Sequence, residues 1–525
     1  MKSFRWTWIA IACVALLAGL TIFDFKRTTK NEEQEEKGRD VLRLSKDALG
    51  HIEIHSRTSQ TILDKQSGNW KLISPISDSA DEQVMQTFMM SLTGEKIAAT
   101  VVEGDQINLD TYGLKDPVKR LELKTEDGKT EEVRIGSVKA YDGNLYAQID
   151  QDRKVYLVSS NWDPMLSRLD KEYRDKHVLR QDLSSTELKK IEFSSAIAKG
   201  DDFQLSQADK HWKISGNALD YPVADLSVAN FLGELRGVRA SDFAPQVAGT
   251  GGAKASYHLD HPRFQVKLFK DAAEPVFAAS FSDFSKLDPK ATGADATKTQ
   301  TSFVMSSDVK DVMIVAKTNV ESVIKTPQDF YDRKLPFRFA KGDVEKIEVA
   351  AEGLLDASFE KMGQNWSLVK LNGGDGKDSK KAAQTAAISG AIEKLSQLEA
   401  VRILELIKKG SQPTVLKKSS QITFFNKSGE SLFRLQWGSK MTEKATEGRP
   451  EAHFMAARTD RVDALIGLPE LQVTGLELAS WIGDPLAPGA TPPPAPSPGA
   501  GHRPPPPFAP TIPRSAVRPP PNSQQ

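Results

Sequence analysis

The chain has 525 residues, which allows about three or four domains of ~150 residues each. Its 70 Lys+Arg balance 70 Asp+Glu, and this zero net charge argues against a nucleic-acid-binding protein, which normally carries a basic surplus. The single cysteine, Cys13, excludes a disulfide framework and a cysteine-based zinc or iron–sulfur site within one chain.

An uncharged apolar run, Trp6–Phe23, lies near the N-terminus. Its length is close to the ~20 residues that a helix needs to cross a membrane, and aromatic residues lie at both ends, as at a membrane interface. A cleaved signal peptide is the competing interpretation, but no small-x-small cleavage site follows the run. We therefore predict a retained transmembrane anchor over 1–28 and a charged stalk over 29–44.

The orientation of this anchor follows from the flanking charges. Lys2 and Arg5 favour a cytoplasmic N-terminus, although Lys26 and Arg27 stand on the other side of the run. We expect a single-pass protein of the bacterial inner membrane, with the bulk of the chain in the periplasm.

Three stretches of similar sequence follow the stalk, and their opening strands are His51–His55, Lys190–Phe193 and Lys346–Val349. About 20 residues later, each stretch has a strand that begins with a tryptophan: Trp70, Trp212 and Trp366. The spacings between these tryptophans, 142 and 154 residues, suit whole domains rather than solenoid units. We predict three tandem repeats, 45–182, 183–340 and a divergent 341–484.

An apolar stripe with helical spacing follows each tryptophan strand, which predicts a helix against a sheet face. The stripes are Val84, Phe88, Met89 and Leu92; Val228, Phe231, Leu232 and Leu235; and Ile388, Ile392, Leu395 and Leu398. Alternating strands without regular βαβ units come next. This pattern predicts an α+β fold, with a mainly antiparallel sheet packed with helices in each repeat.

Two short motifs link the first two repeats. The frame Tyr-x-Leu-x-x-Pro, at Tyr112–Pro117 and Tyr257–Pro262, predicts a turn that leads into a strand. A terminal signature aligns Tyr173–Lys176 with Tyr331–Lys334. The third repeat lacks the tyrosine turn and is expected to end differently, at Leu476–Trp481.

The segment 485–525 holds 16 of the 29 prolines and no acidic residue. Such a composition cannot bury a core, so we predict a disordered tail with polyproline II character. Proline-rich sequence is found both in passive spacers and in ligands for aromatic grooves, so an envelope partner for this tail is one of the two interpretations.

Several patterns that can indicate chemistry are explained by structure alone. His258 and His261 have H-x-x-H spacing but fall in the predicted turn, and Pro262 disfavours a helix there. His51 and His55 alternate on a strand ~13 Å apart, too far to share one metal ion. Ser307–Lys310 matches S-x-x-K without its companion motifs. We assign no catalytic, cofactor-binding or metal-ligating residue and predict a non-enzymatic protein.

The sequence from His51 to Arg180 resembles the family of the domain of unknown function 4340. The residues that carry the resemblance are Trp70-Lys-Leu with Pro75, Asp81 at a helix start, Tyr112-Gly-Leu with Pro117, Ile135-Gly136, Val155-Tyr156 and Tyr173-Arg-Asp175. The resemblance implies a membrane-anchored companion of ABC-2-type or gliding-motility-like ABC transporters. It implies no catalytic residue and no cofactor.

Two functions are compatible with these patterns. The first is a non-enzymatic accessory protein whose partners are an ABC transporter permease or auxiliary subunits at the inner membrane. The second is a carbohydrate- or peptidoglycan-binding envelope protein that stacks sugars on Trp70, Trp212 or Trp366. A repeated strand position favours a core role for these three rings, and their exposure separates the two functions.

Overall fold

The computed structural model describes residues 40–484 except 197–201, 247–251, 272, 287–299, 352–354, 377–380, 409–410, 445–450, 475 and 477. The expected anchor 1–28, most of the expected stalk 29–44 and the expected disordered tail 485–525 lie outside the described residues. Among the residues described, no helix has the length and apolar character to span a membrane. The described residues form two compact units, one drawn from 1–199 and 229–324 and the other from 200–228 and 325–525.

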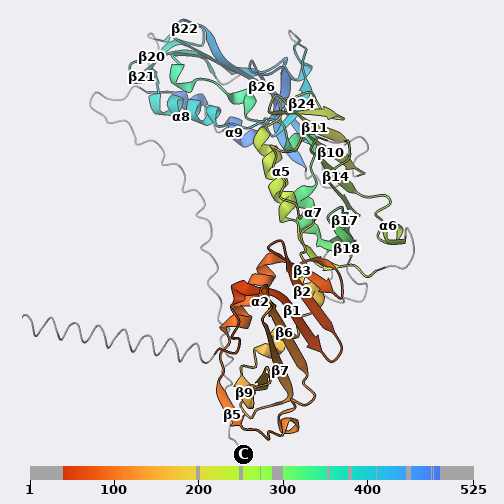
Figure 1. Ribbon diagram of the computed structural model, residues 1–525. Coiled ribbons are helices and arrows are strands. Elements are labelled where there is room, and N and C mark those ends of the chain that lie inside the picture. The colour runs from red at the N-terminus through yellow and green to blue at the C-terminus, as the bar shows by residue number, and fades with distance from the viewer. Residues whose placement is uncertain are drawn as a thin grey trace, which may run out of the picture. The chain divides into compact units, whose positions relative to one another are not determined.

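Three large antiparallel sheets dominate the described part of the chain (Figure 1). The first has the order β4 (Asp78–Ser79), β3 (Asn69–Ser74), β2 (Gln60–Gln66), β1 (Leu49–Ser56), β6 (Lys119–Thr125), β7 (Thr130–Lys139), β8 (Leu145–Ile149), β9 (Lys154–Val158) and β5 (Ala99–Glu103). Its helices are α2 (Glu82–Gly94), α3 (Trp162–Leu166) and α4 (Asp170–Tyr173).

The second sheet repeats this order without a counterpart of β4, as β12 (His211–Gly216), β11 (Phe203–Ala208), β10 (Lys190–Ser195), β14 (Phe264–Phe269), β15 (Phe277–Phe281), β17 (Gln300–Ser306), β18 (Val309–Ala316) and β13 (Ala240–Phe243). The short β16 (Ser285–Lys286) pairs with β17. The accompanying helices are α5 (Asp225–Gly237), α6 (Gly252–Ser256) and α7 (Lys317–Val323).

The third sheet has the same order again: β22 (Gly374–Asp375), β21 (Asn365–Leu371), β20 (Leu355–Met362), β19 (Lys346–Ala351), β25 (Ser420–Phe425), β26 (Ser431–Glu443), β27 (Ala452–Thr459), β28 (Ala464–Pro469) and β24 (Arg402–Leu406). Its helices are α8 (Thr385–Ser396) and α9 (Glu470–Thr474), and β23 (Ala382–Ala383) pairs with β29 (Ile482–Gly483). The expected α+β repeats with antiparallel sheets are therefore confirmed at the level of strand order.

Helix α2 covers one face of the first sheet (Figure 1). Met85, Phe88 and Leu92 are buried on its inner side and share a core with Ile52 and Ile54 of β1. Because side chains alternate along a strand, the polar residues of β1 face away from this core. The predicted stripes are buried in the other repeats as well, although Val84 and Met89 in α2 are only partly buried.

The three repeated tryptophans occupy one structural position. Each is the second residue of its strand, in β3, β12 and β21, and each is paired with the preceding strand of the same hairpin. Trp212 is 4% exposed and Trp366 is 6% exposed, so their predicted core role is confirmed. Trp70 is only partly buried and packs at the margin of its core.

The Tyr-x-Leu-x-x-Pro frame forms the same turn in the first two repeats. Gly113 and His258 both adopt a left-handed backbone, with φ of 66° and 54°. The next residue in each turn, Leu114 or Leu259, is buried and donates its N–H back into the preceding turn. His258 thus replaces a glycine at a position that favours glycine, and His261 is highly exposed, as expected of turn residues.

The third repeat lacks this tyrosine turn, as expected: Lys417, the residue after its short helix, has a right-handed backbone, whereas Gly113 is left-handed. Gly136 and Gly438 lie at irregular positions of β7 and β26, where the pairing register shifts. A Cβ at Gly136 would overlap the carbonyl oxygen of Tyr112, and one at Gly438 would overlap that of Val415. The short helix η7 (Thr414–Leu416) therefore sits against its strand as η2 (Leu109–Tyr112) does.

One buried aromatic residue closes each repeat. The carbonyls of Tyr173, Phe330 and Trp481 accept the N–H of the residue just before α2, α5 and α8, at 2.8, 2.9 and 2.7 Å. Their exposed fractions are 0%, 1% and 0%. The expectation that the third repeat ends differently is therefore wrong, because Trp481 takes the place of Tyr173.

The predicted alignment of the terminal signatures is also wrong, by one residue. Arg174 forms a bridge with Ala80, and Tyr331 forms the corresponding bridge with Val223. Tyr331 is therefore the counterpart of Arg174 rather than of Tyr173. Alignment by residue identity placed the two tyrosines together, whereas backbone pairing to the start of the helix fixes the actual register.

Candidate functional site

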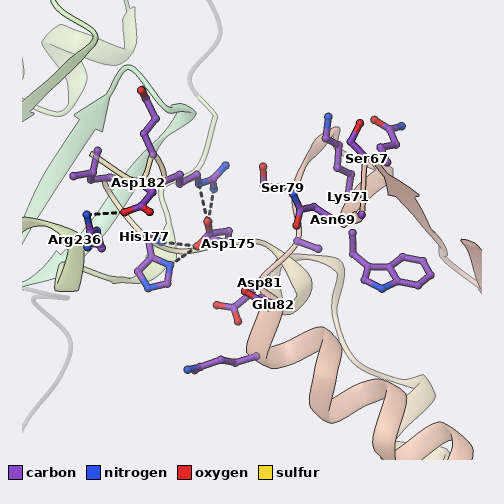
Figure 2. A pocket seen from close by; sticks show the side chains of 18 residues that line it. Ser67, Asn69, Lys71, Ser79, Asp81, Glu82, Asp175, His177, Asp182 and Arg236 are labelled. Carbon is purple, nitrogen blue, oxygen red and sulfur yellow. Dashed lines mark hydrogen bonds and ion pairs between the residues drawn. The ribbon is translucent and has the colours of Figure 1, made fainter. Parts of the chain in front are cut away.

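A cavity of about 720 Å³ lies at the end of the first repeat, inside the first compact unit. The β2–β3 turn, the start of α2, the segment 175–182 and one residue of α5 surround it (Figure 2). Its lining is Gln66, Ser67, Gly68, Asn69, Trp70, Lys71, Ser79, Ala80, Asp81, Glu82, Gln83, Asp175, His177, Leu179, Arg180, Gln181, Asp182 and Arg236. Polar side chains predominate, and Trp70 contributes the indole ring of this lining.

The chain segment after Tyr173 forms one wall by pairing on two sides. The N–H of Asp175 donates to the carbonyl of Ser79 at 2.8 Å, and the N–H of Val178 donates to that of Val238 at 3.0 Å. The N–H of Ala240 also donates to the carbonyl of Lys176, at 2.8 Å. Residues 174–178 therefore lie between the start of α2 and the end of α5.

Asp81 fixes the start of α2 at the cavity wall. It is 3% exposed, and its Oδ1 accepts the N–H of Val84 at 3.0 Å, which makes it the N-cap of the helix. Its other carboxylate oxygen forms an ion pair with Arg239. The family resemblance places Asp81 at a helix start, and the structure confirms that position.

Two arginines and three aspartates form a buried network beside the cavity. The Arg174 side chain is 4% exposed, and it contacts Asp78 at 2.7 Å and Asp311 at 2.6 Å. Arg180 pairs with the same Asp78 and lies 3.5 Å from Asp175. The Arg174 guanidinium also lies over the ring of Phe243, 3.5 Å from its centroid. This network holds the end of the first repeat against strand β18 of the second.

Burial and charge act in opposite directions on the acids of this network. Burial raises the pKa of Asp78, but the hydrogen bonds and charges of Arg180 and Arg174 outweigh it, so the pKa lies below its ordinary value. Burial likewise raises the pKa of Asp175, and hydrogen bonds from His177 with the charge of Arg180 bring it below the ordinary value. Both carboxylates are therefore ionised at neutral pH.

Three side chains at the cavity have the spacing of metal ligands. Ligand atoms of Asp81, Asp175 and His177 lie within 4.8 Å of one another. However, Asp81 already pairs with Arg239, and Asp175 accepts hydrogen bonds from the backbone N–H and ring of His177, at 3.0 and 2.6 Å. Arginines thus supply the positive charge that an ion would bring, and we assign no metal here.

The lining is mostly polar and surrounds one indole ring. Amide and carboxylate groups line the cavity around the partly buried face of Trp70. The ring of His177 is hydrogen-bonded to Asp175, and none of the described lining residues forms a nucleophile–base pair with it. The S-x-x-K match falls elsewhere, with Ser307 and Asp308 at the turn between β17 and β18.

Sequence reasoning singled out parts of this site without assembling them. The sequence indicates Asp81, Trp70 and the signature at Tyr173–Lys176 as structural features. Asp78 was not noted, and it lies about 100 residues from the arginines that bind it. The available signal was the charged run Arg174-Asp175-Lys176 directly after a buried aromatic residue.

The model of the family Domain of unknown function (DUF4340) matches the chain twice, over residues 70–262 and 216–419. The first match includes the cavity segment 175–182, and the second includes the corresponding segment after Phe330. Both matches therefore span the end of one sheet and the beginning of the next. Neither the curated proteins nor the solved structures give a match to this chain.

Proposed function

The chain belongs to the family of the Domain of unknown function (DUF4340), and from this premise we propose that it is a non-enzymatic accessory protein of an ABC-type transporter or envelope complex. In this proposal residues 1–28 anchor it in the inner membrane, and the three repeats lie in the periplasm. The partner, a permease or auxiliary subunit, binds at the cavity that ends the first repeat.

The observation that carries this proposal is that the arginines around the cavity are engaged in ion pairs within the protein. Arg174, Arg180 and Arg239 are each paired with aspartates that lie far from them in sequence. Breaking a buried pair of this kind costs ~3–5 kcal/mol, because it leaves a charge without a partner. These groups hold chain segments in register, which is what a docking scaffold requires, while the exposed rim is free to bind.

In-cell photo-crosslinking tests the proposal. A photoreactive residue at Asn69, on the cavity rim, should capture a permease or auxiliary subunit of an ABC transporter, identified by mass spectrometry. Asn365 is the matched control, because it is exposed and also precedes the tryptophan of its strand. Equal capture from both positions, or no such subunit from Asn69, would contradict the proposed docking surface.

The anchor is tested separately with the full-length chain. Alkaline-washed membranes should retain it, and a reporter fused after Gln525 should be active only outside the cytoplasm. A soluble mature form that starts near residue 19 would contradict the retained anchor. This result would leave the docking proposal standing, since the crosslinks report on the repeats.

One observation favours carbohydrate or peptidoglycan binding as a second candidate. Trp70 lies partly exposed in a cavity with Asn69, Gln66, Gln83 and Asp175, and aromatic faces with planar polar groups suit sugar rings. Trp212 and Trp366 are buried, so this function would depend on the first repeat alone.

Sedimentation with insoluble peptidoglycan distinguishes this candidate from the first. If it is correct, the purified full-length chain should co-sediment, and Trp70→Ala should reduce the bound fraction at least tenfold. Asn69→Ala should weaken binding, whereas Asn365→Ala, its counterpart in the third repeat, should not. Unchanged sedimentation of Trp70→Ala would exclude the cavity as a sugar site.

A further inference from the structure

The outer face of the first sheet carries three glutamates in one cross-strand row. Glu53 of β1 lies directly opposite Glu122 of β6, and Glu122 lies opposite Glu132 of β7. Like charges directly opposite one another destabilise a sheet, so this row requires compensating cations. Arg120 lies 2.9 Å from Glu122, and Arg134 lies 2.9 Å from Glu132.

Glu53 is hydrogen-bonded by two histidines, whereas Glu122 and Glu132 each pair with an arginine. His51 Nε2 lies 2.9 Å from Glu53 Oε1, and His55 Nε2 lies 3.0 Å from Glu53 Oε2. The other ring nitrogen of His51 is hydrogen-bonded to Asp64 of β2. The alternation H-x-E-x-H on a strand places all three side chains on one face. Both histidines therefore contact the same carboxylate, each at a different oxygen.

The ring nitrogen of His55 is the point where two carboxylates converge. It lies 3.0 Å from Glu53 Oε2 and 3.9 Å from Glu122 Oε1, and ligand atoms of these three residues lie within 4.8 Å of one another. Zinc bonds of ~2.0–2.2 Å in a tetrahedral arrangement place adjacent ligand atoms about 3.4 Å apart. The distances from His55 Nε2 to Glu53 Oε2 (3.0 Å) and to Glu122 Oε1 (3.9 Å) lie on either side of that value.

The other two repeats provide an internal comparison at the same positions. Each keeps the central glutamate, as Glu192 and Glu348, but a lysine replaces His51. Lys190 lies 2.7 Å from Glu192, and Lys346 lies 2.8 Å from Glu348. Each lysine thus supplies a fixed positive charge.

The partners across the strand differ as well. Lys267 lies opposite Glu192, and Thr423 lies opposite Glu348. The position of His55 is taken by Ser194 and Ala350. Of the three repeats, it is the first that places a second carboxylate, Glu122, and an imidazole, His55, next to the central glutamate.

We propose that Glu53, His55 and Glu122 bind one divalent transition-metal ion of the zinc class on the outer face of the first sheet. One imidazole nitrogen and two carboxylate oxygens are ligands that zinc accepts, with the fourth position open to water. His51, held by Asp64, is a positioning residue that orients the Glu53 carboxylate, as outer-shell partners of metal ligands do.

The charges around the site fit a divalent cation. An ion placed among Glu53, His55 and Glu122 would be balanced by the two ligand carboxylates, and it would relieve the repulsion between these adjacent glutamates. Arg120 would keep a second partner, since it also lies 3.8 Å from Glu132. The ligand side chains are 23–42% exposed, so an ion can reach them from solvent.

Isothermal titration of the metal-free, full-length chain in detergent with zinc chloride tests the proposal. The wild type should bind zinc at this site, and His55→Ala and Glu122→Gln should each weaken that binding at least tenfold. Glu348→Gln is the matched control and should bind as the wild type does. His51→Gln should weaken binding by ~10-fold or more, without changing the urea midpoint of the zinc-free protein.

Other histidines of the chain can also bind zinc, so X-ray absorption of the one-zinc complex provides a second measurement. It should show a single imidazole among nitrogen and oxygen ligands, and His55→Ala should remove that imidazole. The proposal is overturned if the wild type takes up no zinc, or if a His55→Ala, Glu122→Gln double variant binds zinc as tightly as the wild type.

Discussion

The ends of the first and second repeats use the same backbone pairing with opposite chemistry. At the first end, the bridge between Ala80 and Arg174 places Arg174 beside Asp78, in a buried ion pair. At the second end, the bridge between Val223 and Tyr331 places Tyr331 beside Tyr221, with ring centroids 5.4 Å apart in an edge-to-face contact. An ion pair and an aromatic pair therefore occupy equivalent positions.

This difference shows that backbone register, rather than side-chain type, defines the repeat. The segment that closes each repeat and the start of the helix keep their hydrogen bonds in both repeats, so different side chains can fill the space between them. A buried ion pair depends strongly on both partners being present. An aromatic pair contributes through burial and ring geometry. The two ends should therefore respond differently to mutation and to pH.

The largest effect should come from removing the central cation of the first end. Arg174→Leu leaves the buried Asp78 and Asp311 without their shared partner, and we expect a loss of ~3–5 kcal/mol. Urea unfolding should show the lower stability, and hydrogen exchange should show faster exchange in residues 174–183. Lys115→Leu removes an exposed ion pair and should leave the urea midpoint essentially unchanged. Equal losses in both variants would contradict the importance of the buried network.

A smaller loss should follow from the equivalent change at the second end. Tyr331→Leu removes the edge-to-face contact with Tyr221 and the hydroxyl oxygen that accepts the N–H of Leu219 at 2.7 Å. An unsatisfied buried donor costs ~1–3 kcal/mol, so we expect a loss of ~2 kcal/mol in urea unfolding. Tyr331→Phe keeps the ring and should separate the two contributions. A loss as large as that of Arg174→Leu would remove the distinction between the two ends.

The tryptophans extend the comparison to the neighbouring strand. Trp212 is buried, so Trp212→Ala should cost ~3–5 kcal/mol. Trp70 is partly exposed at the polar cavity, and we expect Trp70→Ala to cost only ~1–2 kcal/mol, because less of its ring leaves water on folding. Urea unfolding of both variants measures the difference. Similar costs would mean that Trp70 is as much a core residue as its counterpart.

Much of the fold was predictable because each repeat carries its own periodic signal. The apolar stripe of α2 and the strand that begins at Trp70 follow from local pattern, and each repeat confirms the others. The end of the repeat was harder. Tyr331 matches Tyr173 by identity, yet it corresponds to Arg174, and the sequence does not identify Trp481 as the counterpart of Tyr173. The alignment of these residues is set by backbone hydrogen bonds between the closing segment and the start of the helix. Such bonds require no particular side chains, so the sequence shows no periodic pattern for them.

The candidate sites depend on contacts that a single strand cannot reveal. Asp78 meets Arg174 and Arg180 only after about 100 residues of chain have folded. The strand pattern places His51 and His55 apart, whereas the structure brings both to Glu53, and the contact of His55 with Glu122 comes from the neighbouring strand β6. Knowing the strand order in advance would have placed Glu122 there. The sequence gives the residue types, and the sheet topology determines which of them come into contact.

The smallest predicted effect is a pH dependence confined to the first end. The pKa of Asp78 lies below its ordinary value: burial raises it, but the hydrogen bonds and charges of Arg180 and Arg174 lower it further. A carboxylate with a depressed folded-state pKa stabilises the fold at pH values above its unfolded pKa, about 3.9. That contribution is lost as the pH falls through the folded-state value, with a slope of at most about 1.4 kcal/mol per pH unit for one proton.

The measurement is the difference in unfolding free energy between the wild type and Asp78→Asn, followed by urea titration from pH 7 to pH 3. The difference should be constant down to about pH 5 and then shrink, because the wild type alone takes up a proton at this position. For Tyr331→Phe the corresponding difference should stay flat over the same range, since burial raises the pKa of Tyr331 above its ordinary value and no acid titrates in the ring pair. If the Asp78→Asn difference also stays flat, the charges of Arg174 and Arg180 do not stabilise ionised Asp78, and the first end is held by packing, as the second is.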